Sequence, residues 1–252
     1  MMSKTILITG ATSGFGEAMA HVFAAAGNKL IITGRKENLL SALQETLVTK
    51  HNAAVHTLCF DVQNKEAVFA AIKTIPDNFS NIDVLINNAG LALGRDAFQD
   101  ANLDDWETMI DTNVKGLLYV SKAVLPLMIN NKKGHIINIG STAGVEVYKE
   151  GNIYCASKHA VAAISKSMRI DLLPQHIKVT AIHPGAAETN FSNTRFKGDE
   201  AKASAVYEGY KALEAVDVAN VAYYVTTLPD HVCINELVVT CTSQANSFYL
   251  QK

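Results

Sequence analysis

The stretch KTILITGATSGFGEAMA, residues 4–20, decides the fold of this 252-residue chain. Its first part, 4–9, is a short apolar run that predicts a buried β-strand. The segment GATSGFG follows at 10–16, and its glycines permit a tight turn with close approach to the backbone. A helical pattern then covers 14–27. A strand, a glycine-rich turn and a helix N-terminus in this order predict a binding site for a pyrophosphate, whereas a tight turn without a ligand is the alternative.

The same alternation of strand and helix continues along the chain. Further apolar runs predict strands at 29–33, 54–60, 82–87, 134–140, 178–183 and 236–240. Helical patterns lie at 36–49, 63–74, 104–130, 153–173 and 215–227. Strands that are apolar throughout are typical of a parallel sheet with helices on both faces. We therefore expect an α/β fold in which residues 1–252 form a single doubly wound Rossmann-type domain with a seven-stranded parallel sheet.

One segment, about 186–214, interrupts the regular alternation. It is polar, rich in small residues and charged, and it follows a predicted strand. Loops after the carboxyl ends of parallel strands commonly bind ligands, so we interpret it as a substrate-loop insert. An ordinary surface loop is the alternative.

Composition excludes several classes of function. The 22 basic residues against 24 acidic ones give a net charge of −2, which argues against a nucleic-acid partner. No apolar run approaches the roughly 18 residues that span a membrane, and the N-terminus has no signal-peptide pattern. The cysteines lack metal-ligand spacing, so we expect free thiols, a cytoplasmic location and no metal site. These cysteines are Cys59, Cys155, Cys233 and Cys241.

The ends of the second and third strands indicate which dinucleotide binds. Arg35 and Lys36 stand where an acidic residue would accept hydrogen bonds from the ribose 2′-hydroxyl of NAD. A guanidinium binds a 2′-phosphate through hydrogen bonds, so Arg35 and Lys36 predict NADP as the cofactor. A solvated basic turn that binds no cofactor is the alternative. Asp61 and Val62 follow the third strand, where Asp61 meets the adenine edge, caps a helix, or does both. After the fourth strand, NNAG at 87–90 lets the backbone run close beside a flat cofactor.

A second group of residues is suited to proton transfer. Tyr154 and Lys158 are four residues apart and therefore project from one helical face. A nearby ammonium favours the phenolate, so we expect Lys158 to lower the pKa of Tyr154. Ser141 follows a predicted strand, where its hydroxyl would hold a substrate oxygen against Tyr154. Asn113 lies within a predicted helix, where an Asn often bends or hydrates the helix and would hold a water in a proton relay.

These motifs resemble the classical short-chain dehydrogenase/reductase family. The match is ordered along almost the whole chain: TGATSGFG, DV, NNAG, Asn113, Ser141, YxxxK, and Pro184-Gly185 with Thr189. The resemblance implies a catalytic tetrad of Asn113, Ser141, Tyr154 and Lys158, with Tyr154 as the general acid/base. It also implies that Lys158 binds the nicotinamide ribose and Thr189 the carboxamide. The cofactor-binding residues expected from the motifs and the resemblance together are Gly10, Ala11, Thr12, Ser13, Gly14, Phe15, Gly16, Arg35, Lys36, Asp61, Val62, Asn88, Ala89, Gly90, Tyr154, Lys158, Pro184, Gly185, Ala187 and Thr189.

Within this family the chain is most similar to the bacterial NADP-dependent 3-hydroxy acid dehydrogenases, also described as L-allo-threonine or serine dehydrogenases and malonic semialdehyde reductases. NNAGLALG, DDWETMIDTNVKGLLY, GHIINIGSTAG and FSNTRFKGDE carry this likeness. It implies a homotetramer that interconverts 3-hydroxy acids (L-allo-threonine, serine, 3-hydroxypropionate) and 3-oxo acids such as malonic semialdehyde. Two segments depart from the subgroup. Residues 144–151 carry charges in place of Trp, Pro and small residues, and the segment after Pro184-Gly185 is one residue shorter.

A hydroxy-acid substrate carries a carboxylate, which needs a cation. Arg195 in the insert is our first candidate because a guanidinium binds a carboxylate through two hydrogen bonds. Lys149 and Arg95 are weaker candidates, and a solvent-facing Arg195 is the alternative. Two other functions remain possible for these motifs: a 3-oxoacyl-thioester reductase, and a catalytically silent NADP-sensing binding protein. The presence of both Tyr154 and Lys158 argues against the second.

Overall fold

Seven parallel strands form the central sheet in a computed structural model that describes residues 3–252. Their order across the sheet is β3-β2-β1-β4-β5-β6-β9. All seven predicted strands are present, which confirms the expected fold class. Their bounds are β1 Thr5–Ile8, β2 Lys29–Gly34, β3 Val55–Cys59, β4 Val84–Asn87, β5 Gly134–Ile139, β6 Ile177–Pro184 and β9 Glu236–Val239.

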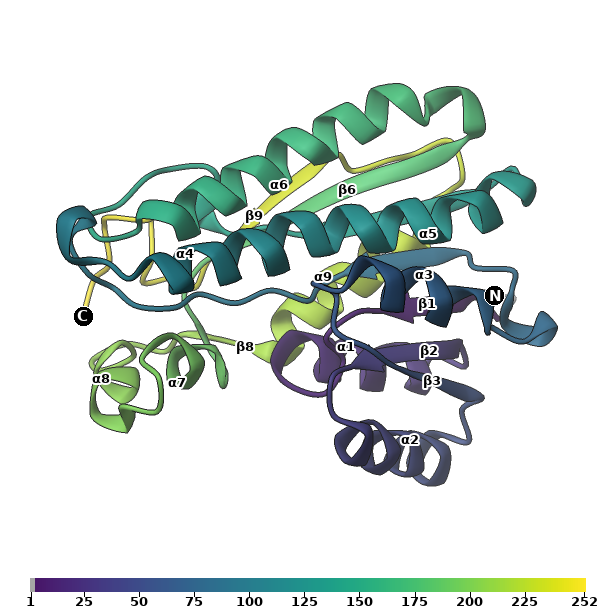
Figure 1. The fold of residues 1–252 in the computed structure, drawn as a ribbon, viewed down its shortest axis with the longest axis horizontal. Coiled ribbons are helices and arrows are strands. Elements are labelled where there is room, and N and C mark those ends of the chain that lie inside the picture. Colours follow the sequence, from purple (N-terminus) through teal and green to yellow (C-terminus); the bar gives the residue numbers. More distant parts are fainter. Residues whose placement is uncertain (1–2) are drawn as a thin grey trace.

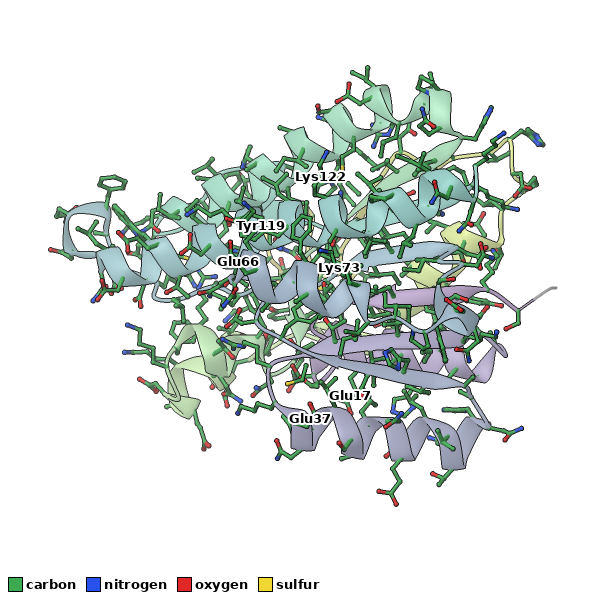
Figure 2. All side chains as sticks on the ribbon, turned by 45° about the vertical axis from the view of Figure 1, so that its right-hand side comes forward. Glu17, Glu37, Glu66, Lys73, Tyr119 and Lys122 are labelled. Carbon is green, nitrogen blue, oxygen red and sulfur yellow. The ribbon has the colours of Figure 1, made fainter. Side chains whose placement is uncertain are left out.

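Helices cover both faces of this sheet (Figure 1). Side chains alternate along a strand, so that Ile6 and Ile8 of β1 belong to one apolar cluster and Leu7 to another. The first cluster is covered by α1 (Gly14–Ala25), α2 (Glu37–His51) and α9 (Ala215–Thr227). The second is covered by α3 (Lys65–Lys73), α5 (Leu117–Asn130) and α6 (Asn152–Asp171). Figure 2 labels Lys73 on α3 and Lys122 on α5, two helices that pack against each other in this second layer.

The segment 104–130 differs from the single helix that its periodicity predicts. The structure has α4 at Leu103–Ile110, a π-helical turn at Asp111–Gly116 and then α5. The π-turn contains Asn113, whose side chain hydrogen-bonds to the backbone of Leu91 outside the helix. Such local widening is common at functional sites, and here it accompanies the anchoring of one side chain.

The insert at 186–214 contains short elements that the sequence did not reveal. Two two-residue strands, β7 (Ala187–Glu188) and β8 (Leu213–Glu214), pair in parallel. Between them lie α7 (Phe191–Arg195) and α8 (Glu200–Ala205), which are too short to show a helical period. In Figure 1 these helices project at the lower left, beyond the body formed by the sheet.

The topology of the sheet places a crevice between β1 and β4. The chain leaves β1 toward β2 and β3 on one side, and then continues from β4 toward β5, β6 and β9 on the other. At such a switch point the loops after the two strands separate, and ligands bind at the carboxyl ends. The glycine-rich turn and the 87–90 loop meet there. Within residues 3–252 no helix combines the length and apolar character that crossing a membrane requires.

Candidate active site

The glycine-rich turn lies directly against the loop that follows β4. Gly10 and Gly14 have φ values of +62° and +55°, a region that side chains with a Cβ rarely adopt. A Cβ on Gly10 would also stand 3.0 Å from the Cα of Ala89. At Gly16 a Cβ would collide with the carbonyl oxygen of Gly10, so this glycine lets α1 begin close to the turn. Only glycine fits at these positions without displacing the backbone.

Hydrogen bonds hold these two loops in place. The side-chain amide of Asn88 donates to the carbonyl oxygens of Thr9 and Gly10, at 2.9 and 3.1 Å. The hydroxyl of Thr9 accepts from the backbone N–H groups of Asn88 and Ala89, both at 3.0 Å. These contacts join the loops that follow β1 and β4, and together the two loops form the floor of the crevice.

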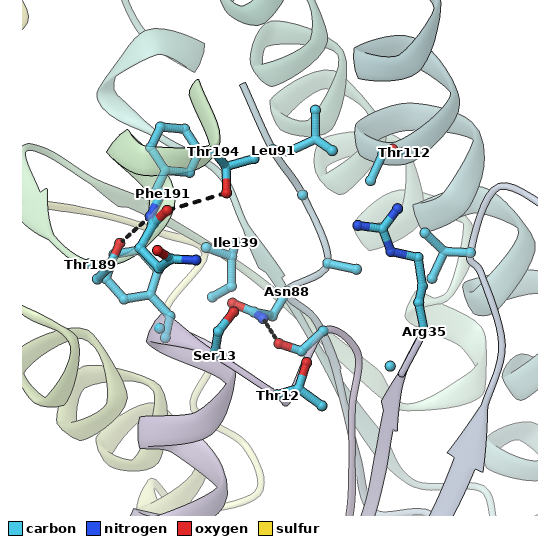
Figure 3. Close-up of a pocket in the computed structure, with 18 of the residues that line it drawn as sticks. Thr12, Ser13, Arg35, Asn88, Leu91, Thr112, Ile139, Thr189, Phe191 and Thr194 are labelled. Atoms are coloured by element: carbon cyan, nitrogen blue, oxygen red, sulfur yellow. Dashed lines mark hydrogen bonds between the residues drawn. The ribbon is translucent and has the colours of Figure 1, made fainter. Parts of the chain in front are cut away.

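A cavity of about 250 Å³, the cofactor cavity, opens above this floor (Figure 3). The expected cofactor-binding residues that do not line it are Ala11, Gly16, Lys36, Pro184, Gly185 and Ala187, and the predicted catalytic residue Asn113 does not line it either. Its lining also contains residues that the motifs did not reveal, such as Thr112, Phe191 and Thr194, which Figure 3 labels. The expected cofactor residues that line it are Gly10, Thr12, Ser13, Gly14, Phe15, Arg35, Asp61, Val62, Asn88, Ala89, Gly90, Tyr154, Lys158 and Thr189.

Arg35 and Asp61 face each other at one end of the cofactor cavity. A guanidinium nitrogen of Arg35 lies 3.6 Å from a carboxylate oxygen of Asp61. The other carboxylate oxygen of Asp61 accepts the N–H of Gln63 at 3.0 Å. The alternative in which Asp61 caps the next helix is wrong, because the side chain of Asn64 caps α3. Lys36 is exposed at the N-cap of α2, outside the lining.

Tyr154 and Lys158 stand at the other end of the cofactor cavity, both on α6 and both buried. The Nζ of Lys158 donates to the carbonyl oxygen of Ile139 at 3.0 Å and lies 6.0 Å from the centre of the Tyr154 ring. Burial lowers the pKa of Lys158 from 10.5 to about 8. Desolvation, with a smaller effect of Tyr148, raises the pKa of Tyr154 above its ordinary value, although Ser141 opposes this. The pKa of Tyr154 is therefore raised in this arrangement and not lowered as expected, because burial outweighs the groups that lower it.

Asn113 reaches the same end from the π-turn. Its side-chain oxygen, Oδ1, accepts a hydrogen bond from the backbone N–H of Leu91 at 2.8 Å. Its side-chain nitrogen, Nδ2, donates to the backbone oxygen of Leu91 at 2.8 Å and to the hydroxyl of Ser157 at 3.0 Å. A Cβ on Gly90 would stand 3.2 Å from the Asn113 oxygen and 3.4 Å from the Lys158 ammonium. The side chains of Asn113 and Lys158 therefore both lie close to Gly90, which lines the cofactor cavity.

A second cavity of about 190 Å³, the substrate cavity, adjoins the first. Tyr154, Thr189 and Phe191 line both cavities. Ser141, whose hydroxyl accepts the N–H of Ala143 at 3.1 Å, lies in the substrate cavity. Pro184, Gly185 and Ala187, which were expected to bind the cofactor, line this cavity instead. The other sequence-predicted residues that line it are Phe15, Arg95 and Arg195. The structure thus brings the predicted phenol, hydroxyl and guanidinium together, and places the first of them at the junction of the two cavities.

Arg195 is held over the substrate cavity by two hydrogen bonds. Its Nε donates to the carbonyl oxygen of Gly94 at 3.2 Å, and its Nη1 donates to the hydroxyl of Tyr148 at 3.1 Å. Arg95 also lines this cavity but is paired with Glu150 at 3.8 Å, whereas the side chain of Lys149 is 90% exposed and lies outside the lining. Among the three cations named from the sequence, Arg195 is therefore the one fixed beside the reacting groups.

Two features of the substrate cavity were missed by sequence reasoning. Tyr148 was not singled out, although a lone aromatic residue among the charges of 144–151 was the available signal. The C-terminal segment also closes the cavity: Gln244 accepts the N–H of Ala186 at 2.8 Å, and the N–H of Ser247 donates to Glu146 at 2.9 Å. No sequence pattern marks this segment, because the contacts depend on where the chain goes after β9. In the described part of the chain, no group of three or more His, Cys, Asp or Glu side chains is placed to hold a metal ion.

Comparison with known proteins agrees with this geometry. The chain is 45% identical to NADP-dependent 3-hydroxy acid dehydrogenase YdfG of Escherichia coli K12 over 241 residues, 95% of this chain and 96% of that protein. It is 46% identical to sulfoacetaldehyde reductase 2 of Chromohalobacter salexigens over 249 residues, 98% of each protein. A solved structure described as the closed form of serine dehydrogenase complexed with NADP+ matches with a TM-score of 0.91 and 45% identity, covering 96% of this chain and 97% of that one. The model of the short chain dehydrogenase family matches residues 4–200, and the chain therefore belongs to that family, as its motifs indicated.

Proposed function

We propose that this chain is an NADP-dependent oxidoreductase that interconverts 3-hydroxy acids, such as L-allo-threonine, serine and 3-hydroxypropionate, with 3-oxo acids such as malonic semialdehyde. One observation carries the choice of an acid as substrate. The guanidinium of Arg195 lies above Tyr154 in the substrate cavity, where that cavity meets the cofactor cavity. A short acid placed there has its anionic end at a cation and its hydroxyl carbon near the acid/base. The names of the relatives, a 3-hydroxy acid dehydrogenase and a serine dehydrogenase, support the same substrate class.

The cofactor cavity fits NADP. The first amides of α1 and the glycine-rich turn would hold the pyrophosphate, because a helix N-terminus attracts anions. Arg35 at the far end would bind the 2′-phosphate, and Asn88, Ala89 and Gly90 form a wall for the flat parts of the molecule. NADPH supplies, when bound, the hydride that reduces a carbonyl carbon. Lys158 would bind the nicotinamide ribose and Thr189 the carboxamide.

Side chains of this protein then transfer the proton to or from the substrate oxygen. Tyr154 donates to the substrate carbonyl oxygen in the reductive direction and withdraws the proton in the oxidative one. The Ser141 hydroxyl holds that oxygen in place. Lys158 and Asn113 both lie beside Gly90. Together with water they resupply the proton to Tyr154 after it has donated its own. A positioned acid/base of this kind accelerates a reaction by about 10²- to 10⁴-fold.

Arg195 has unused capacity for an anion. A guanidinium carries five N–H donors, and the bonds to Gly94 and Tyr148 use two of them. The remaining donors suit a carboxylate, which accepts two parallel hydrogen bonds. They also suit a sulfonate, and the 46% identity with a sulfoacetaldehyde reductase makes sulfoacetaldehyde the second candidate substrate.

A substrate panel tests this proposal. The purified protein is assayed with NADP+ and L-allo-threonine, L-serine, 3-hydroxypropionate, isethionate and 1-propanol by absorbance of the reduced nicotinamide. Malonic semialdehyde, sulfoacetaldehyde and a 3-oxoacyl thioester are assayed with NADPH. We expect kcat/KM for the best carboxylic acid to exceed that for 1-propanol by at least about 100-fold, the effect of one charge-assisted bidentate contact. Preference for the thioester, or for the neutral alcohol, would contradict the proposal, and preference for the sulfonates would select the second candidate.

We also propose the assembly and location of the protein. Leu103, Leu118 and Ile170 on α4, α5 and α6 are exposed apolar residues that a subunit interface would cover, which supports a homotetramer. Light scattering after size exclusion would measure its mass. The cysteines at 59, 155, 233 and 241 are free, as suits the reducing cytoplasm, and fractionation of cells would test that location. The strands of one sheet span 5–239, which supports a single domain with 186–214 as its substrate loop.

A further inference from the structure

The edge of the sheet opposite the candidate active site contains a third cavity, which we call the lysine cavity. Its volume is about 370 Å³. It lies at the amino ends of β1, β4, β5 and β6, the edge of the sheet near the end marked N in Figure 1, away from α7 and α8. The charged residues that line it are Lys4, Lys132, Lys133, Lys178, Asp83 and Asp230.

This cavity is electropositive in a chain whose net charge is −2. Four lysines face two carboxylates, and both carboxylates are already engaged. Asp83 accepts the N–H of Thr5 at 2.8 Å, and Asp230 pairs with Lys133 at 3.0 Å. Among the ion pairs of residues 3–252, none includes Lys4, Lys132 or Lys178. The four lysines therefore outnumber the two carboxylates, and an excess of positive charge remains at this edge.

Two of these lysines are held in position. The ammonium group of Lys4 donates to the carbonyl oxygen of Thr226 in the last turn of α9, and that of Lys178 donates to the carbonyl oxygen of Val232 in the connection between α9 and β9. Each ammonium has three donors, so two remain on each after this bond. A ligand that binds here does not have to order these two long side chains, which lowers the entropic cost of binding.

The electrostatics of the cavity favour a multivalent anion. Burial lowers the pKa of Lys4, and the charges of Lys178 and Lys133 lower it further, while Asp83 and Asp230 partly oppose this effect. The buried wall residue His135 has its pKa lowered to about 3 by desolvation and then by Lys178 and Lys4, so it stays neutral near pH 7. The lysines therefore repel one another, and an anion between them would remove this repulsion.

We propose that the lysine cavity is a binding site for a small ligand that carries a phosphate or diphosphate group. The described lining offers four lysine ammonium groups, which bind phosphate as point charges, and four such charges suit a multivalent anion better than a single carboxylate. A volume of about 370 Å³ accommodates a small molecule and not a nucleic-acid strand. This site is independent of the function proposed above, because no residue of it lines the cofactor or substrate cavity.

Calorimetric titration of the NADPH-saturated protein tests the proposal. Saturation with NADPH occupies the phosphate-binding groups of the cofactor cavity, so added anions report on the remaining sites. Inorganic phosphate, pyrophosphate and ADP are titrated separately. We expect one pyrophosphate per chain to bind with a Kd below 1 mM, and Lys178→Met to weaken it at least about tenfold, the effect of one ion pair. Tighter binding of ADP than of pyrophosphate would identify a nucleotide as the source of the phosphate group, and the reverse would identify the free anion.

A matched variant separates this site from a general effect of charge. Lys73→Met removes one positive charge from the end of α3, outside the lysine cavity, and should leave the Kd for pyrophosphate unchanged. Because Lys178 lies in β6, the fold of Lys178→Met is checked by its NADPH affinity, which should equal that of the wild type. Absence of binding to the wild type up to 10 mM pyrophosphate would overturn the proposal. Equal weakening by Lys73→Met and Lys178→Met would overturn it as well.

Discussion

The guanidinium carbon of Arg195 lies 5.5 Å from the centre of the Tyr154 ring. Tyr148 supports this arrangement, because its hydroxyl accepts a hydrogen bond from Arg195 at 3.1 Å. The centre of the Tyr148 ring lies 5.7 Å from the guanidinium carbon of Arg195. A cation is thus fixed beside the group proposed to transfer the proton. This relationship is the basis of the proposal that the substrate cavity binds short acids.

Replacement of Tyr154 by Phe should abolish turnover while the cofactor still binds. The ring that packs against Phe191 is retained, but the hydroxyl that transfers the proton is lost. We expect kcat to fall by about 10²- to 10⁴-fold. Fluorescence titration of NADPH should give a Kd within about twofold of the wild type, a free-energy difference well below 1 kcal/mol. Full activity in this variant would show that Tyr154 is not the acid/base.

Arg195→Ala should raise KM for hydroxy acids and leave a neutral alcohol little affected. Loss of a charge-assisted hydrogen bond costs about 1.5–3 kcal/mol, which corresponds to a tenfold or larger change. Tyr148→Phe removes only the hydroxyl that positions Arg195, so its KM should rise less, with kcat nearly unchanged. Steady-state kinetics on 3-hydroxypropionate and 1-propanol measure both variants. An equal effect of Arg195→Ala on the acid and the alcohol would remove Arg195 from the substrate site.

Arg35→Ala should reduce the preference for NADPH over NADH. Arg35 lines the cofactor cavity, whereas its neighbour Lys36 does not, so Lys36→Ala is the matched control. We expect Arg35→Ala to weaken NADPH at least about tenfold with little change for NADH, and Lys36→Ala to have a smaller effect. Competitive fluorescence titrations give the six dissociation constants of the wild type and the two variants for NADPH and NADH. If Lys36→Ala has the larger effect, the position of the 2′-phosphate proposed here is wrong.

Lys158→Met should stabilise the fold at pH 7 while destroying activity. The folded protein holds the pKa of Lys158 at about 8, below its ordinary value of 10.5, so folding disfavours the charged form. The resulting loss of folding stability is fully present below about pH 8 and disappears as the pH rises to 10.5. At about 1.4 kcal/mol for each pKa unit, the difference corresponds to roughly 3 kcal/mol. Urea unfolding of both proteins at pH 7 and pH 10 measures it, and a stability difference that does not shrink at pH 10 would contradict the assignment of this burial penalty.

The fold and the cofactor crevice follow from local sequence patterns. Apolar runs such as 29–33 predict buried strands because a strand with helices on both faces excludes polar residues along its length. The glycines at 10, 14 and 16 mark the turn because no other residue fits their backbone conformation or their close contacts. These constraints act within a few residues, so they are visible without a structure.

Helix spacing also placed Tyr154 and Lys158 on one face, since residues four apart in a helix project together. It did not determine their ionisation. The pKa of each group depends on how many atoms of the folded protein replace water around it, and both are buried. The expected effect of the ammonium on the phenol is therefore outweighed by a desolvation that only packing creates.

The tertiary structure alone decided which distant residues share a cavity. Arg195, in the insert, and Tyr148, in the segment before α6, are 47 positions apart and meet only in the folded chain. The lysine cavity brings together the amino ends of four strands, and Gln244 reaches Ala186 only after the last strand is in place. Local propensity acts between neighbours in the chain and therefore determined the elements and their order, whereas contacts of this kind arise from packing those elements together and from no pattern in the sequence.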